Sequence, residues 1–250
     1  MKEDIVIHTE RGDVSAILQR PDGVDSCRLV ILMHGFMANK KLEPLKSIAK
    51  ELEREGMASL RFDFNGHGKS YGRFSDMTVL TELEDARDVF RYACGLPFVK
   101  GVSLLGHSQG GVVAGMLSGE LKDKVEALVM LAPAAVLKDD ALEGVLMGKH
   151  YDPKNPPEKL TVFFHKVGKN FFTEAQTLPI YEVTAGYEGP VCLIHGKEDK
   201  IVPFRYSERY HQLLKGSRLH LLEGENHILS KRRKEVIALS VGFLRHPSTP

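Results

Sequence analysis

The feature that most constrains the fold of this chain is the alternation of short apolar segments with helical segments. Residues 29–33 are apolar at every position, which is typical of a strand buried on both faces of a sheet. Such an alternation predicts right-handed crossovers and a mostly parallel central sheet with helices on both faces. Further strands are expected at residues 58–62, 102–105, 127–131, 191–194 and 219–222.

The expected helices lie between these strands. Residues 79–93 carry apolar side chains at helical spacing, with Ser75 or Asp76 as the expected N-cap and Gly95 after the last turn. Two alternating segments, residues 5–8 and 14–18, precede the first buried strand and predict an antiparallel hairpin. The remaining helices are expected at residues 45–55, 109–117, 206–214 and around 236–243.

The length of 250 residues suits one domain, residues 1–250. Residues 133–181 interrupt the alternation, because they are richer in proline, lysine and aromatic residues and too long for a simple connection. A mostly parallel sheet binds ligands at the carboxyl ends of its strands. We therefore expect residues 133–181 to form a small cap inserted over that edge.

Composition narrows the range of partners. Lys and Arg number 34 against 33 Asp and Glu, so the charge gives no sign of a nucleic acid or an anionic membrane as partner. Three dispersed cysteines predict neither a disulfide framework nor a zinc site, and no grouping suggests a catalytic metal. Acidic residues stand where a signal peptide would be apolar, so a soluble cytoplasmic protein is expected. The sequence leaves a homodimer open.

The segment Gly106-His107-Ser108-Gln109-Gly110 is a G-x-S-x-G motif between an expected strand and an expected helix. In that setting the motif forms a tight, strained turn that presents the serine hydroxyl at the carboxyl edge of the sheet. The alternative is a glycine-rich turn with a capping serine. The motif predicts that Ser108 is a nucleophile.

A serine hydroxyl needs a base that is itself oriented by a carboxylate. In this topology the acid and the histidine follow the serine in the chain. Asp199 follows the strand at residues 191–194, and His227 follows the strand at residues 219–222. We therefore predict Ser108, Asp199 and His227 as the catalytic residues. Three other acids remain as alternatives to Asp199: Glu198, Asp139 and Asp140.

Acyl transfer also needs hydrogen-bond donors for the oxyanion. One expected donor is the backbone N–H of Gln109, the residue after the nucleophile. The other is expected from the His34-Gly35-Phe36 segment after the first buried strand, namely the N–H of Phe36. His34 itself is expected to shape this loop by hydrogen bonding rather than to act as a base.

Together these motifs resemble the α/β-hydrolase superfamily over nearly the whole chain. The segments that carry the resemblance are residues 34–36, 63–70, 106–111, 195–203 and the His227 loop. Within the superfamily the chain is most similar to bacterial cinnamoyl (feruloyl) esterases. That narrower similarity depends on residues 107–111, 131–135 and 178–183.

The resemblance implies release of hydroxycinnamic acids from esters through an acyl-enzyme, without a cofactor. It implies the same catalytic residues and an insertion that binds the aromatic acid, with Asp140 contacting the ring hydroxyl. Met147 and Phe171 stand where related esterases often have further polar groups, and they complete the expected substrate contacts. Four phenylalanines either line an aromatic pocket or pack inside the insertion: Phe163, Phe164, Phe171 and Phe172.

The sequence thus predicts a serine carboxylic-ester hydrolase that acts on a small-molecule ester, with hydroxycinnamate esters as the expected substrates. The fold alone does not choose the acyl group or the acceptor. The alternatives are a monoacylglycerol-lipase-like or short-chain esterase, a thioesterase, an acyltransferase, a carbon–carbon hydrolase and, from another class, a non-catalytic ligand receptor.

Overall fold

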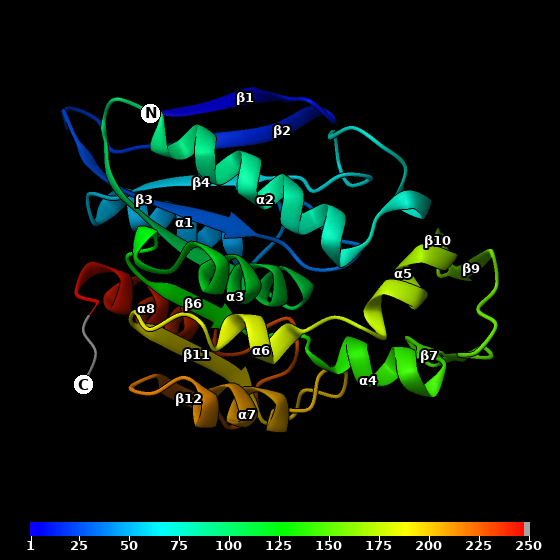
Figure 1. The fold of residues 1–250 in the computed structure, drawn as a ribbon. Helices are drawn as coiled ribbons and strands as arrows, with labels where there is room; N and C mark the ends of the chain where they lie inside the picture. Colours follow the sequence, from blue (N-terminus) through cyan, green and yellow to red (C-terminus); the bar gives the residue numbers. More distant parts are fainter. Residues whose placement is uncertain (248–250) are drawn as a thin grey trace.

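In the computed structural model, which describes residues 1–247, eight strands form one sheet in the order β1-β2-β4-β3-β5-β6-β11-β12 (Figure 1). β1 and β2 form the predicted hairpin, and β2 pairs antiparallel with β4. All other neighbours in the sheet are parallel, which confirms the predicted fold class. The strands are β1 (Lys2–Thr9), β2 (Gly12–Gln19), β3 (Cys27–Met33), β4 (Ala58–Phe62), β5 (Val99–His107), β6 (Leu128–Leu131), β11 (Val191–Gly196) and β12 (Arg218–Leu222).

The central strands divide the core into two layers. Successive side chains of a strand point to opposite faces, so Ile31 packs into the larger apolar cluster and Leu32 into the smaller one. Both side chains are fully buried. A strand covered on both faces must be apolar at every position, which explains the continuous apolar run at residues 29–33.

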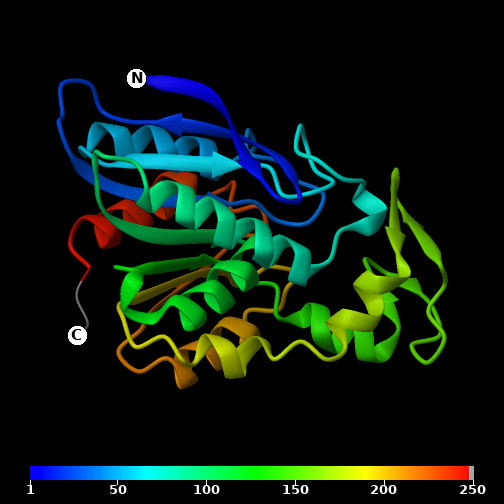
Figure 2. The same cartoon turned by 45° about the horizontal axis from the view of Figure 1, so that its top comes forward.

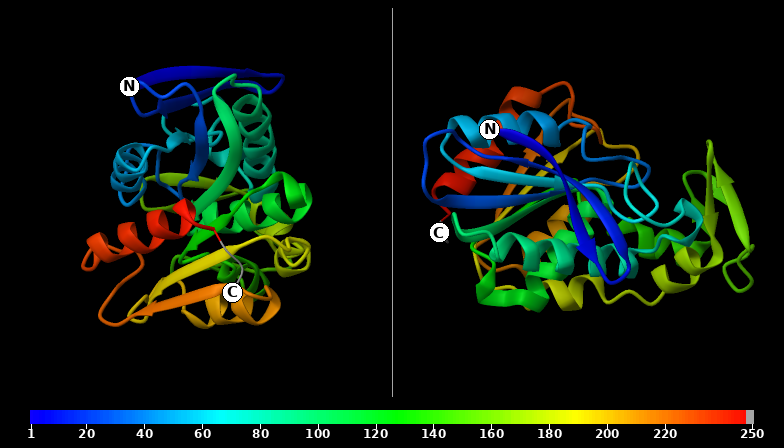
Figure 3. Two further views of the ribbon diagram at one scale, coloured as in Figure 1. Left: turned by 90° about the vertical axis from the view of Figure 1, so that its left-hand side faces the viewer. Right: turned by 90° about the horizontal axis from the view of Figure 1, so that it is seen from above.

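Helices cover both faces of the sheet. α1 and α8 lie on one face, whereas α2, α3 and α7 lie on the other, as the left panel of Figure 3 shows. Within residues 1–247 no helix has both the length and the apolar character to cross a membrane. The helices are α1 (Leu45–Arg54), α2 (Val79–Cys94), α3 (Gln109–Leu121), α4 (Val136–Glu143), α5 (Lys169–Ala175), α6 (Ile180–Thr184), α7 (Arg205–Leu213) and α8 (Arg233–Arg245), with 3₁₀ turns η1 (Phe74–Asp76) and η2 (Lys122–Lys124).

The start of α2 differs from the prediction. Ser75 and Asp76 lie in η1, and the N-cap is Thr78. The Thr78 hydroxyl accepts the backbone N–H of Thr81 at 3.2 Å, while the Thr81 hydroxyl accepts that of Thr78 at 2.9 Å. This reciprocal capping box satisfies two otherwise unpaired N–H groups, so the helix starts later than an N-cap at Ser75 or Asp76 would place it.

Between β6 and β11, the segment that contains α4, two small hairpins and α5 extends beyond the carboxyl ends of the parallel strands (Figure 2). α6, which follows this segment, packs against α3. The larger hairpin packs against η1 through β10. The hairpin strands are β7 (Val145–Leu146), β8 (Lys149–His150), β9 (Lys159–Val162) and β10 (His165–Gly168).

Gly110 allows α3 to begin directly against the end of β3. A Cβ atom added at Gly110 would lie 2.4 Å from the carbonyl oxygen of His34 and 2.5 Å from that of Met33. Contacts this short to backbone atoms cannot be relieved by a side-chain rotation. The glycine is therefore required by close packing between the helix and the strand.

We expect Gly110→Ala to lower the free energy of unfolding by about 1–3 kcal/mol, because the added methyl group overpacks the contact between α3 and β3. Urea unfolding followed by circular dichroism measures the change. Gly242→Ala is the matched control, since Gly242 also lies in a helix but has no atom within 4 Å of an added Cβ. That control should be neutral or stabilising by up to about 1 kcal/mol. An equal loss in both variants would contradict the explanation.

Candidate active site

Ser108 lies in a strained turn between β5 and α3. Its backbone has φ 57° and ψ −122°, a region that a non-glycine residue adopts only when surrounding contacts hold it there. The Ser108 N–H donates to the Leu131 carbonyl at 2.9 Å, and the Ser108 carbonyl accepts the N–H groups of Gly111 at 2.9 Å and Ala134 at 3.0 Å. The neighbouring strand and helix therefore hold the strained conformation in place.

The side chains of Ser108, His227 and Asp199 form one hydrogen-bonded chain. The distance from Ser108 Oγ to His227 Nε2 is 2.9 Å, and that from His227 Nδ1 to Asp199 Oδ2 is 2.7 Å. All three residues are buried. The alternative acid Glu198 is exposed, and Asp139 instead accepts the Tyr206 hydroxyl at 2.7 Å.

The Asp199 carboxylate has donors on both oxygens. Oδ1 accepts the backbone N–H groups of Ile201 at 2.9 Å and Val202 at 2.8 Å, while Oδ2 faces His227 and His195. Burial acts to raise the pKa of Asp199, but the hydrogen bonds from His195 and His227 outweigh it and hold the pKa below its ordinary value. The carboxylate is therefore ionised and oriented toward the His227 ring.

Two residues that the sequence analysis did not select shape the His227 loop. His107 Nε2 donates to the His227 carbonyl at 2.8 Å, and burial lowers the pKa of His107 to about 4, so this ring is neutral. The buried Glu225 carboxylate accepts the backbone N–H groups of Asn226 at 2.8 Å and Arg232 at 2.5 Å. His107 lies within the G-x-S-x-G motif and Glu225 lies two residues before His227, but neither contact has a local sequence signal.

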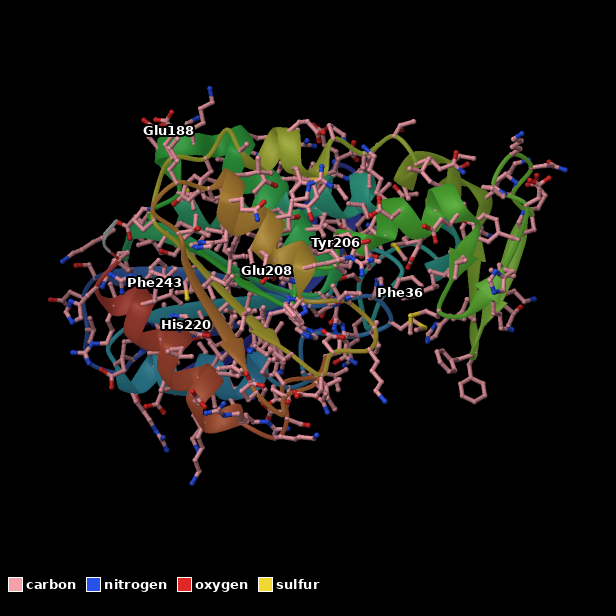
Figure 4. The ribbon with its side chains drawn as sticks, turned by 90° about the horizontal axis from the view of Figure 1, so that it is seen from below. Phe36, Glu188, Tyr206, Glu208, His220 and Phe243 are labelled. Carbon is pink, nitrogen blue, oxygen red and sulfur yellow. The ribbon has the colours of Figure 1, made fainter. Side chains whose placement is uncertain are left out.

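Phe36 and Gln109 both line the cavity that contains Ser108, and Figure 4 shows Phe36 at the end of the sheet that faces the insertion. The loop before Phe36 passes against the serine, because a Cβ added at Gly35 would lie 2.9 Å from Ser108 Cβ. Within residues 1–247 the backbone N–H groups of Phe36 and Gln109 have no acceptor. Both groups are thus available to a ligand oxygen.

The loop that carries Phe36 is shaped as expected by His34. His34 Nδ1 donates to the Gly35 carbonyl at 2.9 Å, and Nε2 accepts the Phe64 N–H at 3.1 Å. Burial, together with the nearby His67, lowers the pKa of His34 to about 3. The ring therefore stays neutral and holds two loops together.

A cavity of about 430 Å³ opens at Ser108 and is covered by residues of the insertion. Asp140, Met147 and Phe171 all line it, whereas the exposed Phe163 and Phe164 lie at the tip of the β9–β10 hairpin. The lining residues are Phe36, Ser108, Gln109, Ala134, Val136, Leu137, Asp140, Ala141, Val145, Leu146, Met147, Gly148, Tyr151, Phe171, Phe172, Lys200, Ile201 and Val202.

Asp140 places a carboxyl group in the wall of this mostly apolar cavity. Burial, and then the charges of Glu143 and Asp139, raise the pKa of Asp140 to about 6. Burial also raises the pKa of Tyr151 to about 12, and its hydroxyl lies 3.4 Å from the Ala141 carbonyl oxygen. No three histidine, cysteine or carboxylate side chains within residues 1–247 are arranged to hold a metal ion.

Several known proteins resemble this chain over most of its length. A structure of Est1E from Butyrivibrio proteoclasticus with bound ferulic acid superimposes with a TM-score of 0.93 at 30% identity, covering 96% of this chain and 97% of that one. The human serine hydrolase BPHL is 26% identical over 86% of this chain and 79% of its own length. Human protein ABHD12B is 23% identical over 88% of this chain, which spans only 56% of that relative.

The family described as serine aminopeptidase, S33, matches residues 25–177, more than half of the chain. The expected resemblance to the α/β-hydrolase superfamily is thereby confirmed. The match includes the G-x-S-x-G turn and the first buried strand. This chain belongs to the serine aminopeptidase S33 family and is a serine hydrolase of the α/β-hydrolase superfamily.

Proposed function

We propose that this protein is a carboxylic-ester hydrolase that works through an acyl-enzyme, with Ser108 as nucleophile, His227 as base and Asp199 as the orienting acid. The observation that carries the proposal is the pair of hydrogen bonds at 2.9 Å and 2.7 Å that links the three side chains. The first distance lies within the reach that proton transfer from Ser108 to His227 needs, and the second is a hydrogen bond by which Asp199 orients the His227 ring. Est1E, which the chain resembles over almost its full length, binds ferulic acid.

The reaction begins when Ser108 Oγ attacks the ester carbonyl carbon while His227 Nε2 takes the hydroxyl proton. The negative oxygen of the tetrahedral intermediate accepts the N–H groups of Phe36 and Gln109. His227 then gives the proton to the oxygen of the leaving alcohol, and the acyl group remains on Ser108. Water attacks this acyl-enzyme with His227 again as base, which releases the carboxylic acid and restores the serine.

The acyl group proposed for this site is a hydroxycinnamate. Residues 133–181 would serve as the cap that selects it. A planar aromatic acid suits a cavity whose walls include Phe171 and Phe172, with Phe36 and Phe171 rings 5.5 Å apart. The carboxyl of Asp140 offers an acceptor for a hydroxyl on the ring.

We expect Ser108→Ala to lower turnover of p-nitrophenyl acetate by at least about 10⁴-fold, since the nucleophile is lost. Labelling by a fluorophosphonate should disappear as well. Ser118→Ala is the matched control, because Ser118 is also buried in α3 and its hydroxyl donates to the Gly115 carbonyl. Turnover retained by Ser108→Ala would disprove the assignment.

We expect Asp140→Ala to lower kcat/KM for ethyl ferulate by about 10-fold or more, because a hydrogen bond to a charged group is lost. Ethyl cinnamate, which lacks the ring hydroxyl, should change by less than about threefold. Asp139→Ala is the control, since its carboxylate binds Tyr206 instead. Equal losses on both esters would show that Asp140 does not contact the hydroxyl.

The preference for ethyl ferulate over ethyl cinnamate should also depend on pH. Because the pKa of Asp140 is raised to about 6, its carboxylate accepts a hydrogen bond from the phenol hydroxyl at pH 7 and becomes protonated toward pH 5. We therefore expect the ferulate-to-cinnamate ratio of kcat/KM to fall between pH 7 and pH 5. The ratio cancels the titration of groups that serve both esters. A ratio that stays constant would contradict the contact.

A substrate panel separates the remaining acyl groups and acceptors. It compares ethyl ferulate with p-nitrophenyl butyrate, a monoacylglycerol, an acyl-CoA and leucine p-nitroanilide, the last because the family description names aminopeptidases. We expect the highest kcat/KM for ethyl ferulate. A higher value for any other member would replace the hydroxycinnamate as substrate without removing the hydrolase chemistry.

A further inference from the structure

A second histidine lies behind the proposed catalytic acid. His195 is on β11, four residues before Asp199, and its side chain has no exposed surface. Its Nε2 is 3.1 Å from Asp199 Oδ2 and 2.9 Å from the Val202 carbonyl oxygen. The oxygen it contacts is the same one that faces His227.

The partners of His195 determine which ring nitrogen carries the proton. Both groups beside Nε2 are acceptors, so Nε2 must carry a hydrogen. Nδ1 is 2.7 Å from the hydroxyl of Ser207, a buried residue of α7. In the Nε2–H tautomer, Nδ1 accepts a hydrogen bond from that hydroxyl, so Ser207 reinforces the tautomer that Asp199 and Val202 already favour.

The Asp199 carboxylate faces hydrogen-bond donors from its own loop, from His195 and from His227. The loop supplies the N–H groups of Ile201 and Val202 to Oδ1, and the two histidines approach Oδ2. With donors on both oxygens the carboxylate cannot rotate without breaking several hydrogen bonds. An apolar residue at position 195 would leave one lone pair of a buried charge unpaired, which is costly.

We propose that His195 is a positioning residue: its Nε2–H, held in that tautomer by Ser207, fixes the orientation of the Asp199 carboxylate toward His227. The proposal depends on the proposed roles of Asp199 and His227. Its consequence is that loss of the Nε2 donor lowers kcat and leaves KM nearly unchanged, because His195 does not line the substrate cavity.

Two substitutions of similar polarity test the donor itself. His195→Gln can place an amide N–H near the former Nε2 position, whereas His195→Asn reaches only as far as the former Nδ1 position. We expect kcat for p-nitrophenyl butyrate to fall about 10- to 100-fold in His195→Asn, the range for loss of a hydrogen bond to a buried charge. His195→Gln should stay within about threefold of the wild type.

Ser207→Ala gives a second measurement that does not alter the ring. Loss of the Ser207 hydroxyl removes the hydrogen-bond partner of Nδ1 and so weakens the hold on the tautomer and orientation of the ring; we expect kcat to fall about 3- to 10-fold. Melting temperatures and rates of fluorophosphonate labelling are measured on all three variants. If His195→Asn does not fold, the outcome for Ser207→Ala decides, and an unchanged kcat there overturns the proposal.

The outcomes separate this inference from the proposed function. Equal losses in His195→Gln and His195→Asn would mean that the ring packs rather than donates, and a wild-type kcat in His195→Asn would remove the role altogether. In both cases Ser108→Ala would still be inactive and the hydrolase assignment would stand. An active Ser108→Ala would instead remove the proposed function.

Discussion

Buried carboxylates that accept loop N–H groups hold the carboxyl edge of the sheet together. Asp63 accepts the N–H groups of Lys40 at 2.7 Å and Lys69 at 2.9 Å, which ties two loops to each other. Asp199 and Glu225 do the same for their own loops. Loop N–H groups near the core need partners, and an ionised oxygen forms stronger hydrogen bonds than a neutral one. These loops therefore fold around buried carboxyl groups that accept their backbone N–H groups.

Sequence patterns predicted the parts of the fold that depend on local or repeating signals. The strands buried on both faces follow from continuous apolar runs, and the turn at Ser108 follows from glycines at the positions where side chains would collide. The order of residues in the chain and the topology of the sheet predicted Asp199 as the acid and His227 as the base. The contacts of His195 and Glu225 could not be predicted, because a buried polar residue in a strand or loop has no pattern that names its distant partner.

The insertion was harder to predict than the sheet. Four phenylalanines fall within residues 163–172, and composition cannot tell which of them point inward. Residues 163 and 164 form the hairpin turn and are 64% and 100% exposed, whereas Phe171 and Phe172 lie on α5 and are buried. The rings at residues 163 and 164 point outward because they lie in the turn of a short hairpin, and the sequence pattern does not determine the register of that hairpin.

The hydrogen bond from His107 to the His227 carbonyl affects which parts of this protein can change during evolution. His107 precedes Ser108 in the chain, so its side chain joins the turn of the proposed nucleophile to the backbone of the proposed base by one hydrogen bond at 2.8 Å. Neither end of that contact belongs to residues 133–181. Mutations in the proposed cap can therefore alter which molecules enter the cavity while the proposed catalytic residues keep their spacing. New substrate ranges are accessible to such a protein without rebuilding its chemistry.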